Sequence, residues 1–105
     1  MSLKTKQHNA SLANGFTTEG LQKDGSNATF VAVFSNVAQN TEAKLQQSVD
    51  GDIWSDIPGS EATIQADQTE QMWNDDITPR GILLRLVVGP SANAQLLTIK
   101  LLSNE

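Results

Sequence analysis

Cysteine and tyrosine are absent from this sequence of 105 residues, which has one histidine, three phenylalanines and two tryptophans. Without cysteine the chain can form neither a disulfide nor a thiolate metal site. The single histidine, His8, lies in a polar segment and has no second histidine to share a metal or a proton with. Neither a Ser/His/Asp triad nor a glycine-rich phosphate loop is present, so the sequence predicts no enzyme and no cofactor.

Long apolar runs are absent as well. No segment approaches the ~18–20 residues that a membrane-spanning helix needs. The first fifteen residues, MSLKTKQHNASLANG, contain no hydrophobic signal segment. We therefore expect a protein that is made in the cytoplasm, is not exported by a standard signal and does not insert into a membrane.

Positive charge is scarce in the middle of the chain. Residues 41–76 contain nine acidic residues against Lys44 alone, whereas the whole chain has a formal net charge of −5. An acidic region of this kind repels phosphates and offers no continuous basic surface. Binding to nucleic acid is therefore not expected.

The apolar residues that are present recur with the period of β-strands. Residues 28–35 (ATFVAVFS) are rich in β-branched and aromatic residues, and residues 41–49 (TEAKLQQSV) alternate between apolar and polar. Five more strands are expected, at residues 52–57, 62–66, 69–73, 82–89 and 95–103. In the last of these, alternation places Leu97, Ile99 and Leu101 on one face and Leu96 on the other. Turns recur about every 8–12 residues and no helical period is sustained, which is typical of a sandwich or barrel.

The sequence thus predicts an all-β fold: an antiparallel β-sandwich, jelly-roll or immunoglobulin-like, of about seven or eight strands. We expect a single domain at residues 21–105, preceded by an extended N-terminal arm at residues 1–20 with at most a short strand near residues 11–17. The expected core residues are as follows: Phe30, Phe34, Leu45, Ile57, Ile64, Leu84, Leu86, Ile99 and Leu101. Ile82 is expected to continue the same apolar face as Leu84.

Residues 48–60 (SVDGDIWSDIPGS) allow three interpretations. Asp50-Gly51 is a strong signal for a tight hairpin turn. Three aspartates could supply oxygen ligands to calcium, but Asp52 and Asp56 would flank an indole instead of converging on one ion. Alternatively, Trp54 could stack on a sugar while Asp52 and Asp56 accept hydrogen bonds from its hydroxyls, with Trp73 as a second indole. Packing of Trp54 against a neighbouring strand or the end of the sheet, where it covers the core, is the more ordinary alternative, and no metal ligand is assigned.

A resemblance rests on three segments: KLQQSVDGDIWSDIP, RGILLRLVVG and AQLLTIKLL. Over residues 42–102 they are similar to the second half of discoidin-like and galactose-binding jelly-roll domains, and to small β-sandwich modules of tailed-bacteriophage virion proteins. The resemblance implies that Asp-Gly is a hairpin turn and that the Trp is mainly structural. The chain is too short for a complete discoidin domain and lacks the cysteine pair of many secreted members, which favours the phage modules.

On this basis we expect a non-catalytic virion structural protein: a capsid decoration, cement or head–tail accessory protein that binds itself and other virion proteins. The alternative is a carbohydrate-binding β-sandwich. In the first case the N-terminal arm would act between subunits, because it has no apolar period of its own to stabilise it. The residues expected to contact a neighbouring subunit are Leu3, Lys4, Lys6, Leu12 and Phe16.

Overall fold

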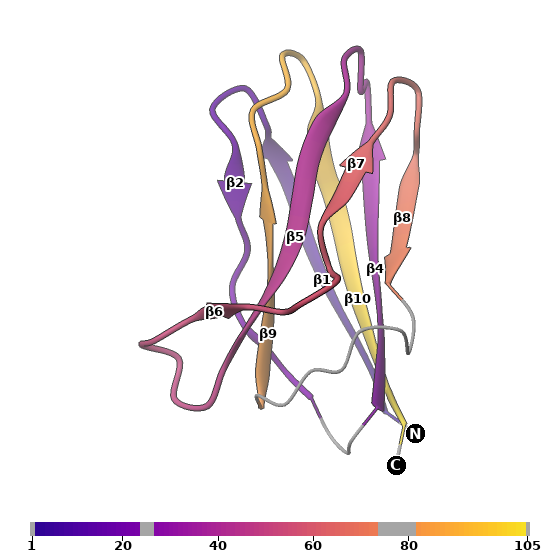
Figure 1. The fold of residues 1–105 in the computed structure, drawn as a ribbon. Coiled ribbons are helices and arrows are strands. Elements are labelled where there is room, and N and C mark those ends of the chain that lie inside the picture. The colour runs from indigo at the N-terminus through magenta and orange to yellow at the C-terminus, as the bar shows by residue number, and fades with distance from the viewer. Residues whose placement is uncertain (1, 24–26, 74–81, 105) are drawn as a thin grey trace.

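The computed structural model describes residues 2–23, 27–73 and 82–104, and they form two antiparallel β-sheets packed face to face (Figure 1). The strands are β1 Ser2–Ser11, β2 Phe16–Thr17, β3 Leu21–Gln22, β4 Asn27–Ser35, β5 Thr41–Ser48, β6 Ser55–Asp56, β7 Ala62–Ile64, β8 Glu70–Trp73, β9 Leu83–Val88 and β10 Gln95–Asn104. One sheet has the order β1-β10-β4-β8. The other has the order β2-β9-β5-β6, with β3 also on β9 and β7 also on β5. The all-β sandwich is confirmed.

The strand order also decides between the two expected types of sandwich. Strands β2 and β3 both pair with β9, and strands β6 and β7 both pair with β5, so each pair is one interrupted strand. Counted in this way the described residues form eight strands, and apart from the β5–β6 hairpin the chain changes sheet at every connection between them. Two four-stranded sheets connected in this way are the arrangement of the jelly roll.

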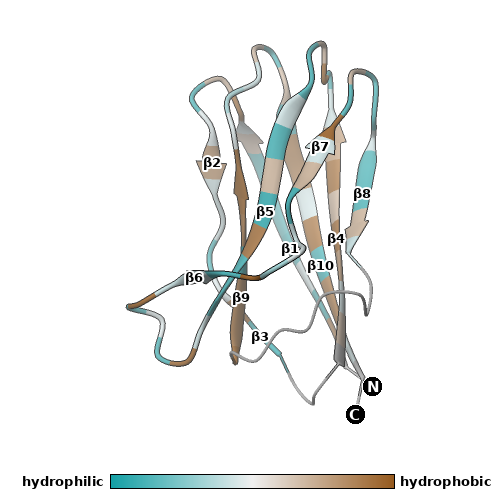
Figure 2. Cartoon of the chain, in the orientation of Figure 1, coloured by the Kyte–Doolittle hydropathy of each residue, from teal (hydrophilic) through white to brown (hydrophobic). Residues whose placement is uncertain are grey.

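The core lies between the two sheets, and the alternation of the sequence explains which side chains fill it. Figure 2 shows β9 and much of β4 as hydrophobic, whereas β5 alternates between hydrophobic and hydrophilic bands. All nine residues expected in the core are at most 2% exposed. Ile82 differs: it precedes β9 and is 49% exposed, so the apolar face of this strand begins at Leu84.

A β-bulge changes the inward face of β10. Its register with β4 shifts between Leu96 and Thr98, so that Leu96 pairs with Phe34 while Ile99 pairs with Ala32. Leu96 and Ile99 are therefore both fully buried, although simple alternation places them on opposite faces. An extra residue in one strand reverses the alternation beyond it, which the residue types alone did not reveal.

The expected division into an arm and a body is wrong for most of the first twenty residues. Strand β1 pairs along nearly its whole length with β10, from Ser2 opposite Ser103 to Ser11 opposite Gln95. Leu12 follows it and is fully buried. The period of β1 is hidden because its inward positions include Lys4 and Lys6, and because the register shifts near Asn9, which has φ +50°. The N-terminal segment is thus an edge strand of the domain.

Candidate functional site

The outer face of the sheet containing β5 and β9 carries the loop that the sequence singled out. Residues 49–54 connect β5 to β6, so Asp50-Gly51 lies in a hairpin but in a longer loop than a two-residue turn. Ser48 Oγ accepts hydrogen bonds from the backbone N–H of Asp50 and Gly51 at 3.2 and 2.8 Å. Asp50 Oδ1 accepts from the N–H of Asp52 and Ile53 at 2.9 and 3.1 Å. These bonds hold the pKa of the Asp50 carboxyl below its usual value, and they fix the loop from within.

Trp54 closes this loop and lies back over the sheet. Its Nε1–H donates to the carbonyl of Gly51 at 3.0 Å, and the Arg85 guanidinium carbon lies 4.2 Å from the ring centroid. A methyl group at Gly20 would come within 2.8 Å of the indole, so only glycine leaves room for the ring in this position. The indole is half-buried by these contacts. Its cation–π contact with Arg85 therefore occupies a ring face that a sugar would otherwise use.

A chain of hydrogen bonds continues from Arg85 across the sheet. Arg85 Nε donates to Gln46 Oε1 at 2.9 Å, and Gln46 Nε2 donates to Asp56 Oδ1 at 2.8 Å. Lys44 Nζ donates to the second carboxylate oxygen, Asp56 Oδ2, at 3.0 Å. The bonds from Gln46 and then from Lys44 hold the pKa of Asp56 below its usual value. We call Trp54, Arg85, Gln46, Asp56 and Lys44 the polar ladder.

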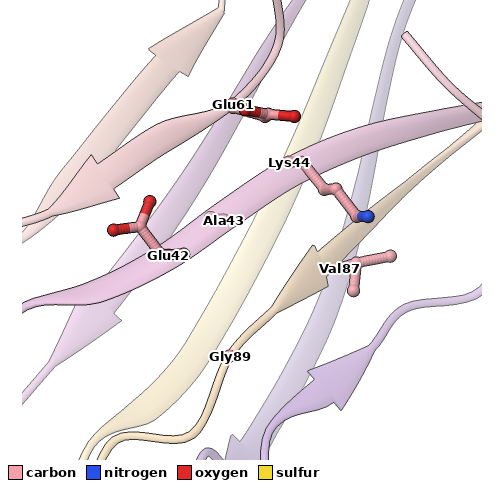
Figure 3. A pocket seen from close by; sticks show the side chains of 6 residues that line it. All are labelled: Glu42, Ala43, Lys44, Glu61, Val87 and Gly89. Carbon is pink, nitrogen blue, oxygen red and sulfur yellow. The ribbon is translucent and has the colours of Figure 1, made fainter.

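A shallow hollow of about 350 Å³ lies beside the polar ladder (Figure 3). The side chains of Lys44 and Val87 extend from the neighbouring strands β5 and β9, and that of Glu61 comes from the segment before β7. The residues that line the hollow are Glu42, Ala43, Lys44, Glu61, Val87 and Gly89. A small polar molecule on this surface would meet two carboxylates and one ammonium group at the rim and the side chain of Val87 below.

Of the four residues expected to contact a glycan, the structure brings Trp54 and Asp56 onto this face. Asp52 is exposed in the loop. Trp73 is placed elsewhere, and its expected role as a second sugar platform is wrong: it is 5% exposed and packs edge to face against Phe30 with centroids 5.9 Å apart. Its indole N–H donates to the carbonyl of Ser60 at 2.7 Å, which satisfies the polar end of a buried tryptophan.

Sequence reasoning did not find Arg85, Gln46 and Lys44 as members of a site. The alternation of residues 41–49 does place Lys44 and Gln46 on a polar face, and that of residues 82–89 places Arg85 on the face opposite the core-facing residues; that was the available signal. Their contact depends on the register in which Gln46 faces Arg85 on one side and Asp56 on the other. Register between distant strands cannot be read from local alternation.

The residues expected to contact a neighbouring subunit are mostly engaged within the chain. Lys6 forms an ion pair with Glu19 at 3.6 Å, and Lys4 Nζ donates to the carbonyl of Gln22 at 2.7 Å. Leu12 is fully buried in the core, and Phe16 is half-buried against it. Lys4, Lys6 and Phe16 are thus engaged between β1 and the segment containing β2 and β3, through Gln22, Glu19 and His8 respectively. Leu3 differs from the apolar residues among them, because 64% of its surface is exposed.

Leu3 belongs to a second candidate surface, the outer face of the sheet β1-β10-β4-β8. Residues that pair across neighbouring strands point to the same side of a sheet, so the registers give the side chains on this outer face. Leu3 lies beside Leu102. Val31 lies between Lys100 and Met72, and Val33 lies between Thr98 and Glu70. Met72 is 47% exposed, and Val31, Val33 and Leu102 are partly buried. We call this surface the apolar face. Among the described residues, Lys100 and Glu70 are its only charged side chains.

The described parts of the chain contain neither a cluster of metal ligands nor a membrane-spanning helix. In those ranges, no three His, Asp or Glu side chains gather closely enough to hold a metal ion. Nor does any helix within them have the length and apolarity to cross a membrane.

Comparison with known proteins gives little further information. No protein-family model matches the chain, and no curated protein matches it. Among solved structures, a chain titled "Crystal structure of PirA" aligns over 97% of this chain and 93% of its own length, with 8% sequence identity and a TM-score of 0.49. The function has therefore to be inferred from the residues of the chain itself.

Proposed function

We propose that this protein is a non-catalytic structural component of a bacteriophage particle, and that it assembles in the particle through the apolar face. The observation that carries the proposal is the exposure of large apolar side chains there, with Leu3 at 64% and Met72 at 47%. Neighbouring rows of the same sheet add Val31, Val33 and Leu102. A contiguous apolar surface of this kind marks a site of association in a folded protein.

The distribution of charge supports the same surface. The opposite outer face carries the ionised side chains of the polar ladder and of the hollow, which are strongly hydrated and costly to cover. The apolar face exposes threonines, aliphatic side chains and one charge of each sign. Interfaces are depleted in charged residues at their centres, so the apolar face is the better candidate.

The fold is compatible with the proposal without deciding it. Jelly-roll sandwiches occur both in viral capsid proteins and in lectins, and one fold serves many functions. The resemblance of residues 42–102 to small virion modules favours the capsid or tail reading. The jelly roll equally fits the galactose-binding domains that the same segments resemble.

The experiment measures whether the chain is incorporated into phage particles. Particles from the phage or prophage that encodes the chain are purified on a density gradient and probed for the chain. We expect the wild-type chain to sediment with the particles, and Met72→Lys to remain in the soluble fraction because a charge is placed in the interface. Thr17→Lys is the control, since Thr17 is exposed and lies on the outward face of the opposite sheet. A wild-type chain that never sediments with particles contradicts the proposal.

The second candidate function is glycan binding by the polar ladder and the hollow. The observation that favours it is the placement of Trp54, Asp56 and Lys44 on one exposed face beside a hollow of about 350 Å³. A glycan array tests it directly. Binding that is lost in both Trp54→Ala and Asp56→Asn, but kept in Met72→Ala, supports it. An array without binding by the wild-type chain removes it.

A further inference from the structure

The two charges on the apolar face lie on either side of its centre. Lys100 pairs with Val31 in β4, and Glu70 in β8 pairs with Val33, so the line from one charge to the other passes between the two valines. Both charged side chains are exposed. No ion pair involves either of them in the described part of the chain.

We propose that the occupant of the apolar face is a second copy of this chain, packed face to face about a two-fold axis that passes between Val31 and Val33. The inference rests on the proposed function, because it names the partner of the same surface. In such an isologous contact the same patch is used twice. The axis brings Lys100 of each copy over Glu70 of the other, and the valines of the two copies pack against one another at the centre.

Charge favours a second copy at this face and at no other broad face. The chain has a net charge of −5, so two copies repel one another unless the contact surface is itself neutral. The apolar face is neutral and self-complementary, since its lysine meets a glutamate twice. Packing through the opposite outer face would instead bring together Glu42, Glu61 and the polar ladder of both copies.

The edges of the sheet are poor alternatives for association. Strand β1 directs Lys4 and Lys6 toward the interior beside Leu101 and Ile99, and a register shift interrupts it near Asn9. The described part of strand β8, at the other edge, spans four residues. Inward charges, bulges and short edge strands all oppose the addition of a further strand. Association by the whole face is therefore favoured over pairing at these two edges.

The size of the face is sufficient. The molecule measures 36 × 26 × 23 Å along its principal axes, and β1 and β10 are each ten residues long. A stable interface takes about 800 Å² from each partner. A broad side of this molecule provides an area of that order.

Sedimentation equilibrium of the full chain, up to millimolar concentration, tests the inference. We expect a species with twice the chain mass of 11.3 kDa. Lys100→Glu and Glu70→Lys should each raise the dissociation constant about tenfold, because each places two pairs of like charges in contact. The double variant should restore the wild-type value. Glu61→Lys is the matched control: it changes the net charge as Glu70→Lys does, on the opposite face, and should not weaken the dimer.

Two results overturn the inference. A wild-type chain that stays monomeric at all concentrations has no second copy on this face. If Met72→Lys still prevents particle incorporation in that case, another particle protein occupies the face and the proposed function stands. The second result is a dissociation constant of the dimer that is unchanged in both charge-reversal variants, or that the double variant fails to restore to the wild-type value. Either outcome shows that the dimer uses another surface or another axis. Failure of the proposed function is read separately, from particle sedimentation of the wild-type chain.

Discussion

The hydroxyl of Ser60 takes the place of a strand partner for Leu45. Leu45 N–H donates to Ser60 Oγ at 3.1 Å, and Ser60 Oγ donates to the carbonyl of Leu45 at 3.1 Å. The serine is fully buried and lies where the strand made of β6 and β7 is interrupted. Thr18 does the same at the break between β2 and β3, where its Oγ1 accepts from the N–H of Leu86 at 2.9 Å. Two buried hydroxyls thus provide backbone hydrogen bonds at both edges of the sheet that contains β5 and β9.

Replacing Ser60 with alanine should therefore lower the free energy of unfolding by about 1–3 kcal/mol, because the buried N–H of Leu45 loses its acceptor. Denaturant unfolding measures the change. Ser91→Ala is the matched control: its hydroxyl is also buried but has no hydrogen-bond partner in the described part of the chain, so its removal should cost little. Equal losses in the two variants would show that the contact with Leu45 is not the cause.

Strand β1 should be indispensable for folding. Deleting residues 1–12 removes its pairing with β10 and the fully buried side chain of Leu12, and it exposes the long edge of β10. We expect the cooperative thermal transition to be lost or strongly lowered. Leu12→Ala should cost about 2–5 kcal/mol, whereas Leu3→Ala, at a side chain 64% exposed, should stay within about 0.5 kcal/mol. A truncated chain with the wild-type melting temperature would restore the interpretation of this segment as a separate arm.

Stability should fall as the pH falls below neutrality, because of His8. Burial lowers the pKa of His8, Glu19 opposes that effect, and Lys6 adds to it. A folded-state pKa below the unfolded value of about 6.5 means that the unfolded chain binds the proton more readily. The stability that neutral His8 contributes is fully present above the unfolded-state pKa. It is lost as the pH falls through that pKa toward the lower folded-state pKa.

Melting temperatures measured from about pH 8 to about pH 5.5 check this dependence, because histidine is the side chain that ordinarily titrates in that range. His8→Gln should flatten the profile. His8 also packs edge to face against Phe16, with centroids 5.4 Å apart, so the variant is compared by the slope of its profile and not by its absolute stability. An unchanged slope in His8→Gln would assign the dependence to other groups.

Calcium should leave the melting temperature unchanged. Asp50 Oδ1 already accepts hydrogen bonds from two backbone N–H groups and from the hydroxyl of Ser48, so this carboxylate is committed to holding the loop. Thermal melts in millimolar calcium chloride and in EDTA should coincide. A rise of several degrees in calcium would contradict the prediction, because a ligand that binds only the native state raises its apparent stability.

The period of the apolar residues was sufficient to predict the fold class and the core. Phe30, Leu45, Leu86 and similar residues alternate with polar or smaller ones inside single strands, and that alternation is a property of a few neighbouring residues. The same reasoning placed Lys44 and Gln46 on the polar face of β5 and Arg85 on the outward face of β9. It therefore indicated where a site could lie, although not which residues would meet there.

What the sequence by itself determined is thus local: an all-β chain, its inward side chains and its turns. The tertiary structure alone decided the jelly-roll order, the inclusion of β1 and the separate fates of the two tryptophans. Lys4 and Lys6 masked the period of β1, and its pairing with β10 joins segments about 95 residues apart. Trp54 and Trp73 each follow an apolar residue and precede a polar one in sequence, but long-range register places one over Arg85 and the other against Phe30. Register and strand order depend on which distant segments bury one another best, and neighbouring residues do not encode that choice.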